Sequence, residues 1–150
     1  NMQIYCAKRL STSGINFPKI VKIDKKRGLM LTQYLEGENL ASYLGKSDMT
    51  DDLFESLFLN QYMARRSALT LDYLPENFII VKGKVFYTYP FYKKYDHKED
   101  LTEKYIRLYF NTNELGNYLK KLGISYDISR IKDSYATNKQ IVLTTCKHYK

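Results

Sequence analysis

The stretch Leu71–Pro90, LDYLPENFIIVKGKVFYTYP, decides how the rest of the chain is interpreted. It begins with an acid and an amide in close succession, Asp72 and Asn77. An apolar run from Phe78, a Lys-Gly-Lys turn and a second apolar and aromatic run follow, and this pattern is typical of a β-hairpin. The stretch therefore predicts a loop that holds two polar side chains, followed by a hairpin.

The segment before this stretch carries alternating helix and strand signals. Apolar residues at helical spacing predict a helix over 2–13, which Gly14 ends. Residues 19–34 alternate between apolar and polar side chains around a basic turn and predict an antiparallel hairpin. A short helix is expected over 40–44. A long amphipathic helix is expected over 51–68, and its continuous apolar stripe makes it the expected core helix.

The segment after this stretch is expected to be mainly helical. Helices are predicted from Leu101 and over 113–122, with Gly123 ending the second. Beyond residue 123 the apolar pattern weakens, so residues 141–143 are interpreted as a strand and the lysine-rich end as a mobile tail. The chain as a whole is predicted to be α+β, mainly helical, with two short β-hairpins.

Composition favours a water-soluble protein with an anionic partner. The 150 residues include 24 basic and 16 acidic side chains, a net charge of +8, which suits a nucleotide, RNA or an acidic protein. The alternative explanation is a lysine-rich soluble surface without such a partner. Cys6 and Cys146 have no metal-ligand spacing, so a reduced, cytoplasmic protein is expected. His97 and His148 stand alone in charged stretches and are expected to be solvated. The sequence contains no long apolar run and no signal peptide, which predicts no membrane partner.

Three segments, in this order, carry a resemblance to a known superfamily. They are Ser13–Lys19 (SGINFPK), Leu29–Glu38 (LMLTQYLEGE) and Leu71–Ile80 (LDYLPENFII). Together they resemble the protein-kinase-like superfamily, and among its members the small atypical kinases of the tRNA threonylcarbamoyladenosine machinery and the aminoglycoside phosphotransferases.

The resemblance implies a division of the chain. Residues 1–150 would form a single kinase-like domain, in which 1–34 are a remnant of the small lobe and 35–123 form the large lobe. Residues 124–150 would then be a basic C-terminal tail. Two explanations of the truncated small lobe stay open, a shortened relative or a piece of a larger protein.

The resemblance also implies a site. Asp72 lies where the superfamily has its catalytic base, and Asn77 lies where it has a magnesium ligand. The backbone of the hinge residues Gln33, Tyr34 and Leu35 would face the adenine of ATP, so ATP and Mg²⁺ are the implied cofactors. The alternative is that Asp72 and Asn77 only form hydrogen bonds with loop backbone, as Asp and Asn often do in turns.

The sequence departs from the superfamily where its chemistry is concentrated. The metal-binding acid expected at the end of the hairpin is replaced by Thr-Tyr-Pro at 88–90. The next carboxylate in the sequence is Asp96, and Asp96 and Asp100 are the candidates for a second carboxylate near Asp72. The chain also lacks a glycine-rich phosphate loop and a convincing strand lysine. These departures predict a degenerate catalytic site.

Three functions follow as hypotheses. The first is a degenerate, pseudokinase-type module that binds or scaffolds a protein partner. The second is an active ATP-dependent phosphotransferase that uses Asp72 and Asn77. The third is an RNA-binding accessory protein, because basic side chains contact phosphate and tyrosines stack on bases. The basic and aromatic residues concerned are Lys120, Lys121, Arg130, Lys132, Lys139, Lys147, Lys150, Tyr126, Tyr135 and Tyr149.

Overall fold

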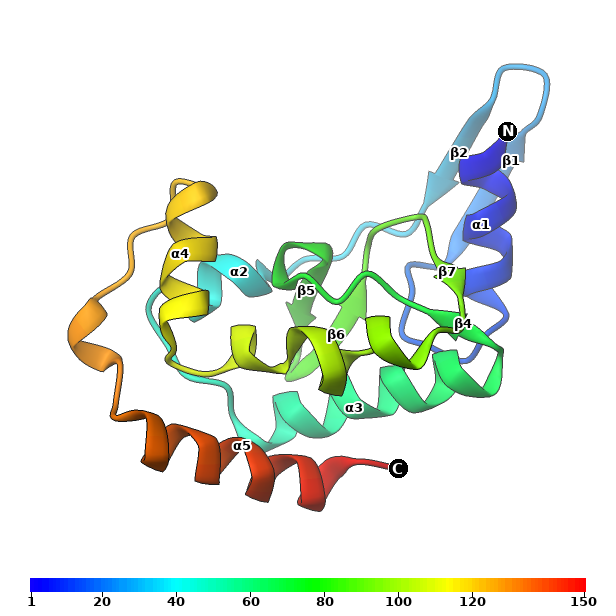
Figure 1. Cartoon of the computed structure of the whole chain (residues 1–150). Coiled ribbons are helices and arrows are strands. Elements are labelled where there is room, and N and C mark those ends of the chain that lie inside the picture. The colour runs from blue at the N-terminus through cyan, green and yellow to red at the C-terminus, as the bar shows by residue number, and fades with distance from the viewer.

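The computed structural model describes every residue from Asn1 to Lys150 and has an α+β architecture in which helices predominate. Its strands form three small sheets, with strand orders β1-β2, β3-β5-β6 and β4-β7 (Figure 1). The predicted α+β class, the mainly helical character and both hairpins are confirmed. None of the helices combines the length and the apolar character that crossing a bilayer requires.

The N-terminal part consists of one helix and one hairpin. Helix α1 (Met2–Ser11) is followed by strands β1 (Ile20–Asp24) and β2 (Leu29–Thr32). Asn1 caps α1, and Gly14 adopts a φ of +90°, a left-handed conformation that glycine accepts without steric cost. The hairpin projects from the body of the molecule with α1 beside it (Figure 1). The sequence predicted all three elements.

Helix α3 (Asp51–Arg66) lies at the centre of the molecule, as its apolar stripe predicted. The Thr50 hydroxyl accepts a hydrogen bond from Leu53 N at 3.2 Å and begins the helix. Leu57 and Phe58 are fully buried within a hydrophobic core that extends along the chain from Leu10 to Leu119. The short helix α2 (Leu40–Leu44) precedes α3 and contributes three buried side chains to the same core.

The two other sheets include three strands that the sequence did not predict. Strand β3 (Glu38–Asn39) pairs with β5 (Phe78–Val81), which forms the predicted hairpin with β6 (Lys84–Tyr87). Strand β4 (Leu69–Thr70) pairs with β7 (Lys93–Lys94). Strands β3, β4 and β7 have two residues each, so none is long enough to show an alternating pattern.

The C-terminal third corrects two expectations. Residues Leu101–Tyr109 form a π-helical turn and then a 3₁₀ turn instead of a regular helix, whereas α4 (Asn113–Lys121) was predicted correctly. The strand expected at 141–143 is wrong, because these residues lie within helix α5 (Ser134–His148). Helix α5 packs against the N-terminal half of α3 and is not a loose tail (Figure 1).

Buried polar side chains on α3 connect this helix to the hairpin. Asn60 Oδ1 accepts a hydrogen bond from Asn16 N at 2.8 Å, and Asn60 Nδ2 donates to Val85 O at 3.0 Å. Ser56 Oγ accepts from Val85 N at 2.9 Å. Val85 belongs to β6, the second strand of the hairpin, so these bonds fix the position of the hairpin on α3. The loop that leads into β5 is thereby fixed at its end.

We expect Asn60→Ala to destabilise the protein by about 2–3 kcal/mol, because buried backbone groups of Asn16 and Val85 lose a partner. Urea unfolding measures this change. Asn117→Ala, at an exposed position of α4, is the matched control and should change stability by less than about 0.5 kcal/mol. Equal effects of the two substitutions would contradict the connecting role of Asn60.

Candidate functional site

The structure places Asp72 and Asn77 in one loop, between β4 and β5, as the sequence predicted. The Asn77 side-chain amide donates a hydrogen bond to the backbone carbonyl of Asp72 at 3.1 Å. The Asp72 carboxylate accepts from Leu74 N at 3.3 Å. Both side chains are therefore engaged with loop backbone, which is the structural role that the sequence left open as the alternative.

The Tyr87 hydroxyl holds the first part of this loop. It accepts a hydrogen bond from Asp72 N at 3.0 Å and donates one to Phe91 O at 2.8 Å. Tyr87 is fully buried at the end of β6. One phenol thus connects the loop to the segment that leaves the hairpin.

Two further tyrosines hold the middle of the loop. Tyr109 donates a hydrogen bond to Tyr73 O at 2.5 Å, and the Tyr118 hydroxyl accepts one from Glu76 N at 2.9 Å. Burial raises the pKa values of Tyr109 and Tyr118, and the negative charge of Asp72 raises them further. The hydroxyls therefore remain protonated at neutral pH, and the backbone of the loop is fixed at several points.

The end of the hairpin closes on the same loop. Thr88 donates two hydrogen bonds to Asn77 O, from its backbone N at 2.9 Å and from its hydroxyl at 3.1 Å. This is where the kinase resemblance leads us to expect a metal-binding acid. No group of three or more His, Cys, Asp or Glu side chains in the chain is arranged to hold a metal ion. The donor set at Asn77 does not fit a carboxylate-rich magnesium site.

A cavity of about 160 Å³ lies beside Asp72. Its walls include aromatic rings and the carboxylates of Asp72 and Glu99. Glu99 forms ion pairs with Lys93 at 3.3 Å and Lys104 at 2.6 Å, and hydrogen bonds from Lys104 and Lys93 lower its pKa. The second carboxylate near Asp72 is thus Glu99, and its charge is already neutralised by lysines.

The two carboxylates that the sequence suggested as neighbours of Asp72 do not line this cavity. Asp96 caps a 3₁₀ turn by accepting from Lys98 N at 3.0 Å. Asp100 is buried, with 2% of its surface exposed, and burial raises its pKa. Burial, and after it the charge of Asp100, raises the pKa of the Tyr73 hydroxyl, which makes no hydrogen bond. Asp96 therefore caps a turn and Asp100 is buried, and neither carboxylate faces the cavity beside Asp72.

The hinge residues Gln33, Tyr34 and Leu35 lie just after β2 and do not line the cavity beside Asp72. Gln33 bonds to Lys19 through its backbone N at 2.7 Å, and Tyr34 is 87% exposed. The cavity is smaller than the roughly 300–1,000 Å³ of ordinary small-molecule sites. The adenine-binding role of these residues stays a prediction.

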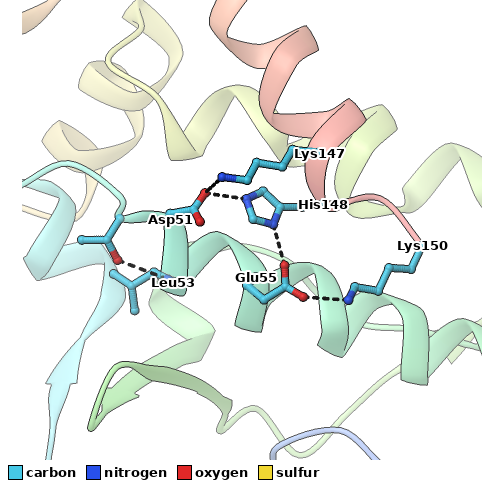
Figure 2. A network of polar contacts seen from close by, with 7 residues as sticks. Asp51, Leu53, Glu55, Lys147, His148 and Lys150 are labelled. Carbon is cyan, nitrogen blue, oxygen red and sulfur yellow. Dashed lines mark hydrogen bonds and ion pairs between the residues drawn. The ribbon is translucent and has the colours of Figure 1, made fainter.

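A cluster that the sequence did not predict joins α5 to α3 (Figure 2). His148 Nδ1 lies 2.7 Å from Glu55 Oε2, and Nε2 lies 2.9 Å from Asp51 Oδ1. Only 2% of His148 is exposed, and its ring packs against Phe54 and Phe58. The expectation that His148 is solvated was wrong, whereas His97 is exposed as predicted.

Lysines complete this cluster, which we call the α3–α5 clasp (Asp51, Glu55, Lys147, His148 and Lys150). Lys147 pairs with Asp51 at 2.9 Å, and Lys150 pairs with Glu55 at 2.7 Å. Ionised carboxylates only accept hydrogen bonds, so both contacts of His148 form together when both ring nitrogens carry protons. The acids at 51 and 55 lie one helical turn apart, but nothing in the sequence connects them to residues more than 90 positions away.

Some basic side chains of the C-terminal tail form ion pairs within the protein. Arg130 pairs with Asp48 at 2.6 Å, and Lys147 and Lys150 belong to the clasp. Tyr126 donates to Asn111 Oδ1 at 2.9 Å. Four of the seven basic residues form no ion pair: Lys120, Lys121, Lys132 and Lys139. The charge available to an RNA is therefore smaller than the sequence suggested.

Comparison with known proteins adds no relative: no protein-family model and no curated protein matches this chain. The site is therefore interpreted from its own geometry.

Tyr87→Phe tests the anchoring of the loop. We expect a loss of about 2 kcal/mol in the free energy of unfolding, because the Asp72 N–H and the Phe91 carbonyl lose their partner. Chemical denaturation gives the value. Tyr89→Phe removes a hydroxyl that makes no hydrogen bond within the chain, from a partly exposed ring, and should change stability by less than about 0.5 kcal/mol. A loss in Tyr89→Phe as large as in Tyr87→Phe would argue against anchoring.

The clasp predicts a stability difference that depends on pH. Hydrogen bonds from Lys147 and His148 lower the pKa of Asp51 from its ordinary 3.8, and those from Lys150 and His148 lower the pKa of Glu55 from 4.5. Depressed carboxylate pKa values stabilise the folded state above the ordinary values, and this contribution is lost as the pH falls through the lower, folded ones.

Thermal melts of the wild type and of Asp51→Asn/Glu55→Gln check this expectation. The variant should melt lower at pH 7, and the gap should close as the pH falls below about 4. A gap of constant size across this range would show that the two carboxylates do not contribute through their charge.

Proposed function

We propose that this chain is a kinase-like, pseudokinase-type module that binds or scaffolds a protein partner and does not transfer phosphate. The order of elements supports the kinase resemblance: a helix, a hairpin and a hinge segment precede α2, the central α3, a polar loop and a second hairpin. The observation that carries the loss of catalysis is the double hydrogen bond from Thr88 to Asn77 O.

The chemistry of phosphoryl transfer explains why this observation supports the proposal. Magnesium ions that bridge phosphates need a concentration of negative charge, which one carboxylate and one amide do not supply. Thr88 brings a neutral hydroxyl to the place of an acid, and it donates its hydrogen bond to the backbone. The amide of Asn77 and the carboxylate of Asp72 also bond to backbone. Phosphotransfer through Asp72 and Asn77 is therefore the less supported alternative.

For a chain that does not transfer phosphate, we favour binding of a protein over binding of RNA. Three of the basic side chains proposed for RNA are neutralised by acids of α3 and the preceding loop. We place the protein in the cytoplasm, where its two unpaired cysteines, Cys6 and Cys146, would remain reduced.

Thermal denaturation with ATP and Mg²⁺ tests the proposal. A site with a dissociation constant of about 10 µM would stabilise the fold by ~2.7 kcal/mol at about 1 mM ATP, which raises the melting temperature by several degrees. We expect no rise. A rise that requires Mg²⁺ and disappears in Asp72→Ala would contradict the proposal and favour the phosphotransferase alternative.

A further inference from the structure

The positive charge of the chain is concentrated in its N-terminal part. Residues 1–34 carry seven basic side chains and a single acidic one, so they account for six of the eight net positive charges. Five of the seven lie on or beside the β1–β2 hairpin: Lys19, Lys22, Lys25, Lys26 and Arg27. Arg27 pairs with Asp24 at 3.7 Å, and the four lysines form no ion pair. The remaining 116 positions are nearly neutral in sum.

The same hairpin is an incomplete sheet. It has two strands only, so the outer backbone groups of each strand have no strand partner. Helix α1 packs against β1, and no strand pairs with the outer edge of β2. A two-stranded sheet is marginally stable in water by itself, and an open edge is a template for another strand.

One face of the hairpin exposes two leucines beside charged side chains. Ile23 pairs with Met30, and both are half-buried. On the opposite face, Leu31 pairs with Lys22 and is 59% exposed, and Leu29 pairs with Asp24 and is 58% exposed. The side chains of this face border a shallow cavity of about 360 Å³.

Protection against aggregation explains only part of this arrangement. Lysines on an edge strand discourage pairing with other copies of the same chain, because like charges repel. Protection against aggregation does not explain why Leu29 and Leu31 are exposed to water on this face. Exposed leucines, an unpaired strand edge and a positive field together fit an extended segment that carries acids and apolar residues in alternation.

We propose that the β1–β2 hairpin is the docking site for an acidic, extended segment of a partner protein, which adds to the outer edge of β2 as a further strand. Its backbone would pair with β2, and its apolar side chains would cover Leu29 and Leu31. The positive charge of the hairpin lysines, Lys22 and Lys26 among them, would attract its carboxylates. A single-stranded nucleic acid fits less well, because the exposed side chains of this face are aliphatic and offer no ring for bases to stack on. The site is remote in sequence from Asp72, and the inference does not depend on the loss of catalysis.

Fluorescence anisotropy with labelled peptides tests this proposal on the 150-residue chain. The probe is a peptide of about ten residues that alternates glutamate and valine, which has the length of a typical strand. Two comparison peptides replace every glutamate by lysine, or two of the valines by proline, which prevents pairing on both edges. We expect the acidic peptide to bind and both comparison peptides to fail.

Variants of the protein separate charge at the hairpin from net charge. Lys22→Glu/Lys26→Glu should weaken binding of the acidic peptide by about tenfold or more, and salt should weaken it in the wild type. Lys121→Glu/Lys139→Glu makes the same change in net charge far from the hairpin and should leave the affinity unchanged. Leu29→Ser/Leu31→Ser should also weaken binding, and circular dichroism confirms that each variant folds.

Several results would overturn the proposal. They are no binding of the acidic peptide, equal binding of the lysine or proline peptide, or equal losses in both charge variants. Tighter binding of a short oligouridine would identify a nucleic-acid surface instead. Self-association that is lost in Leu29→Ser/Leu31→Ser would make a second copy of the chain the occupant.

Discussion

One buried phenol holds the start of the loop between β4 and β5. The Tyr87 hydroxyl accepts from the Asp72 amide and donates to the Phe91 carbonyl, so it joins the start of the loop to the chain beyond the hairpin. An unpaired amide or carbonyl in such surroundings would cost about 1–3 kcal/mol. The ring itself is held by the core, where it packs against Phe78 at 5.3 Å between centroids. The hairpin therefore positions the loop, and hydrogen bonds from Asn60 and Ser56 on α3 position the hairpin.

Contacts within the chain account for the shape of this loop. Its backbone is fixed by tyrosine hydroxyls, by the amide of Asn77 and by Thr88, and none of these contacts requires a nucleotide or a metal ion. In a working phosphotransferase the same region has to present free carboxylates to phosphate-bound magnesium. Here Asp72 is the one acid of the loop that lines the adjacent cavity, and the other acid there, Glu99, is paired with lysines. The proposal of a binding module rests on this contrast.

The elements with strong local patterns were predictable from sequence. The apolar stripe of α3, the two hairpins and the loop between them appear in the structure close to where the sequence placed them. The two-residue strands were not predictable, because their pairing is decided by segments far away in the chain. Helix α5 was missed because residues 141–143 are apolar and partly β-branched, while the ion pairs that anchor its C-terminal end come from α3.

In the candidate site, too, local features were predictable from the sequence and contacts between distant residues were not. The sequence identified Asp72 and Asn77 as neighbours, and it identified the lack of an acid at the end of the hairpin. It did not show that three of the fifteen tyrosines hold the loop, since a count of phenols says nothing about where each hydroxyl points. Nor did it reveal His148 between Asp51 and Glu55, because that contact joins residues more than 90 positions apart.

Paramagnetic broadening is the most direct measurement of the central claim, that the loop is a structural element and not a metal–nucleotide site. Mn²⁺ occupies the same oxygen-ligand sites as Mg²⁺ and broadens the NMR signals of nearby nuclei. In a ¹⁵N-labelled sample titrated with Mn²⁺ and ATP, the account predicts that the Asn77 side-chain amide and the Asp72 backbone amide keep their line widths. Selective broadening of these two signals at substoichiometric Mn²⁺ would contradict it.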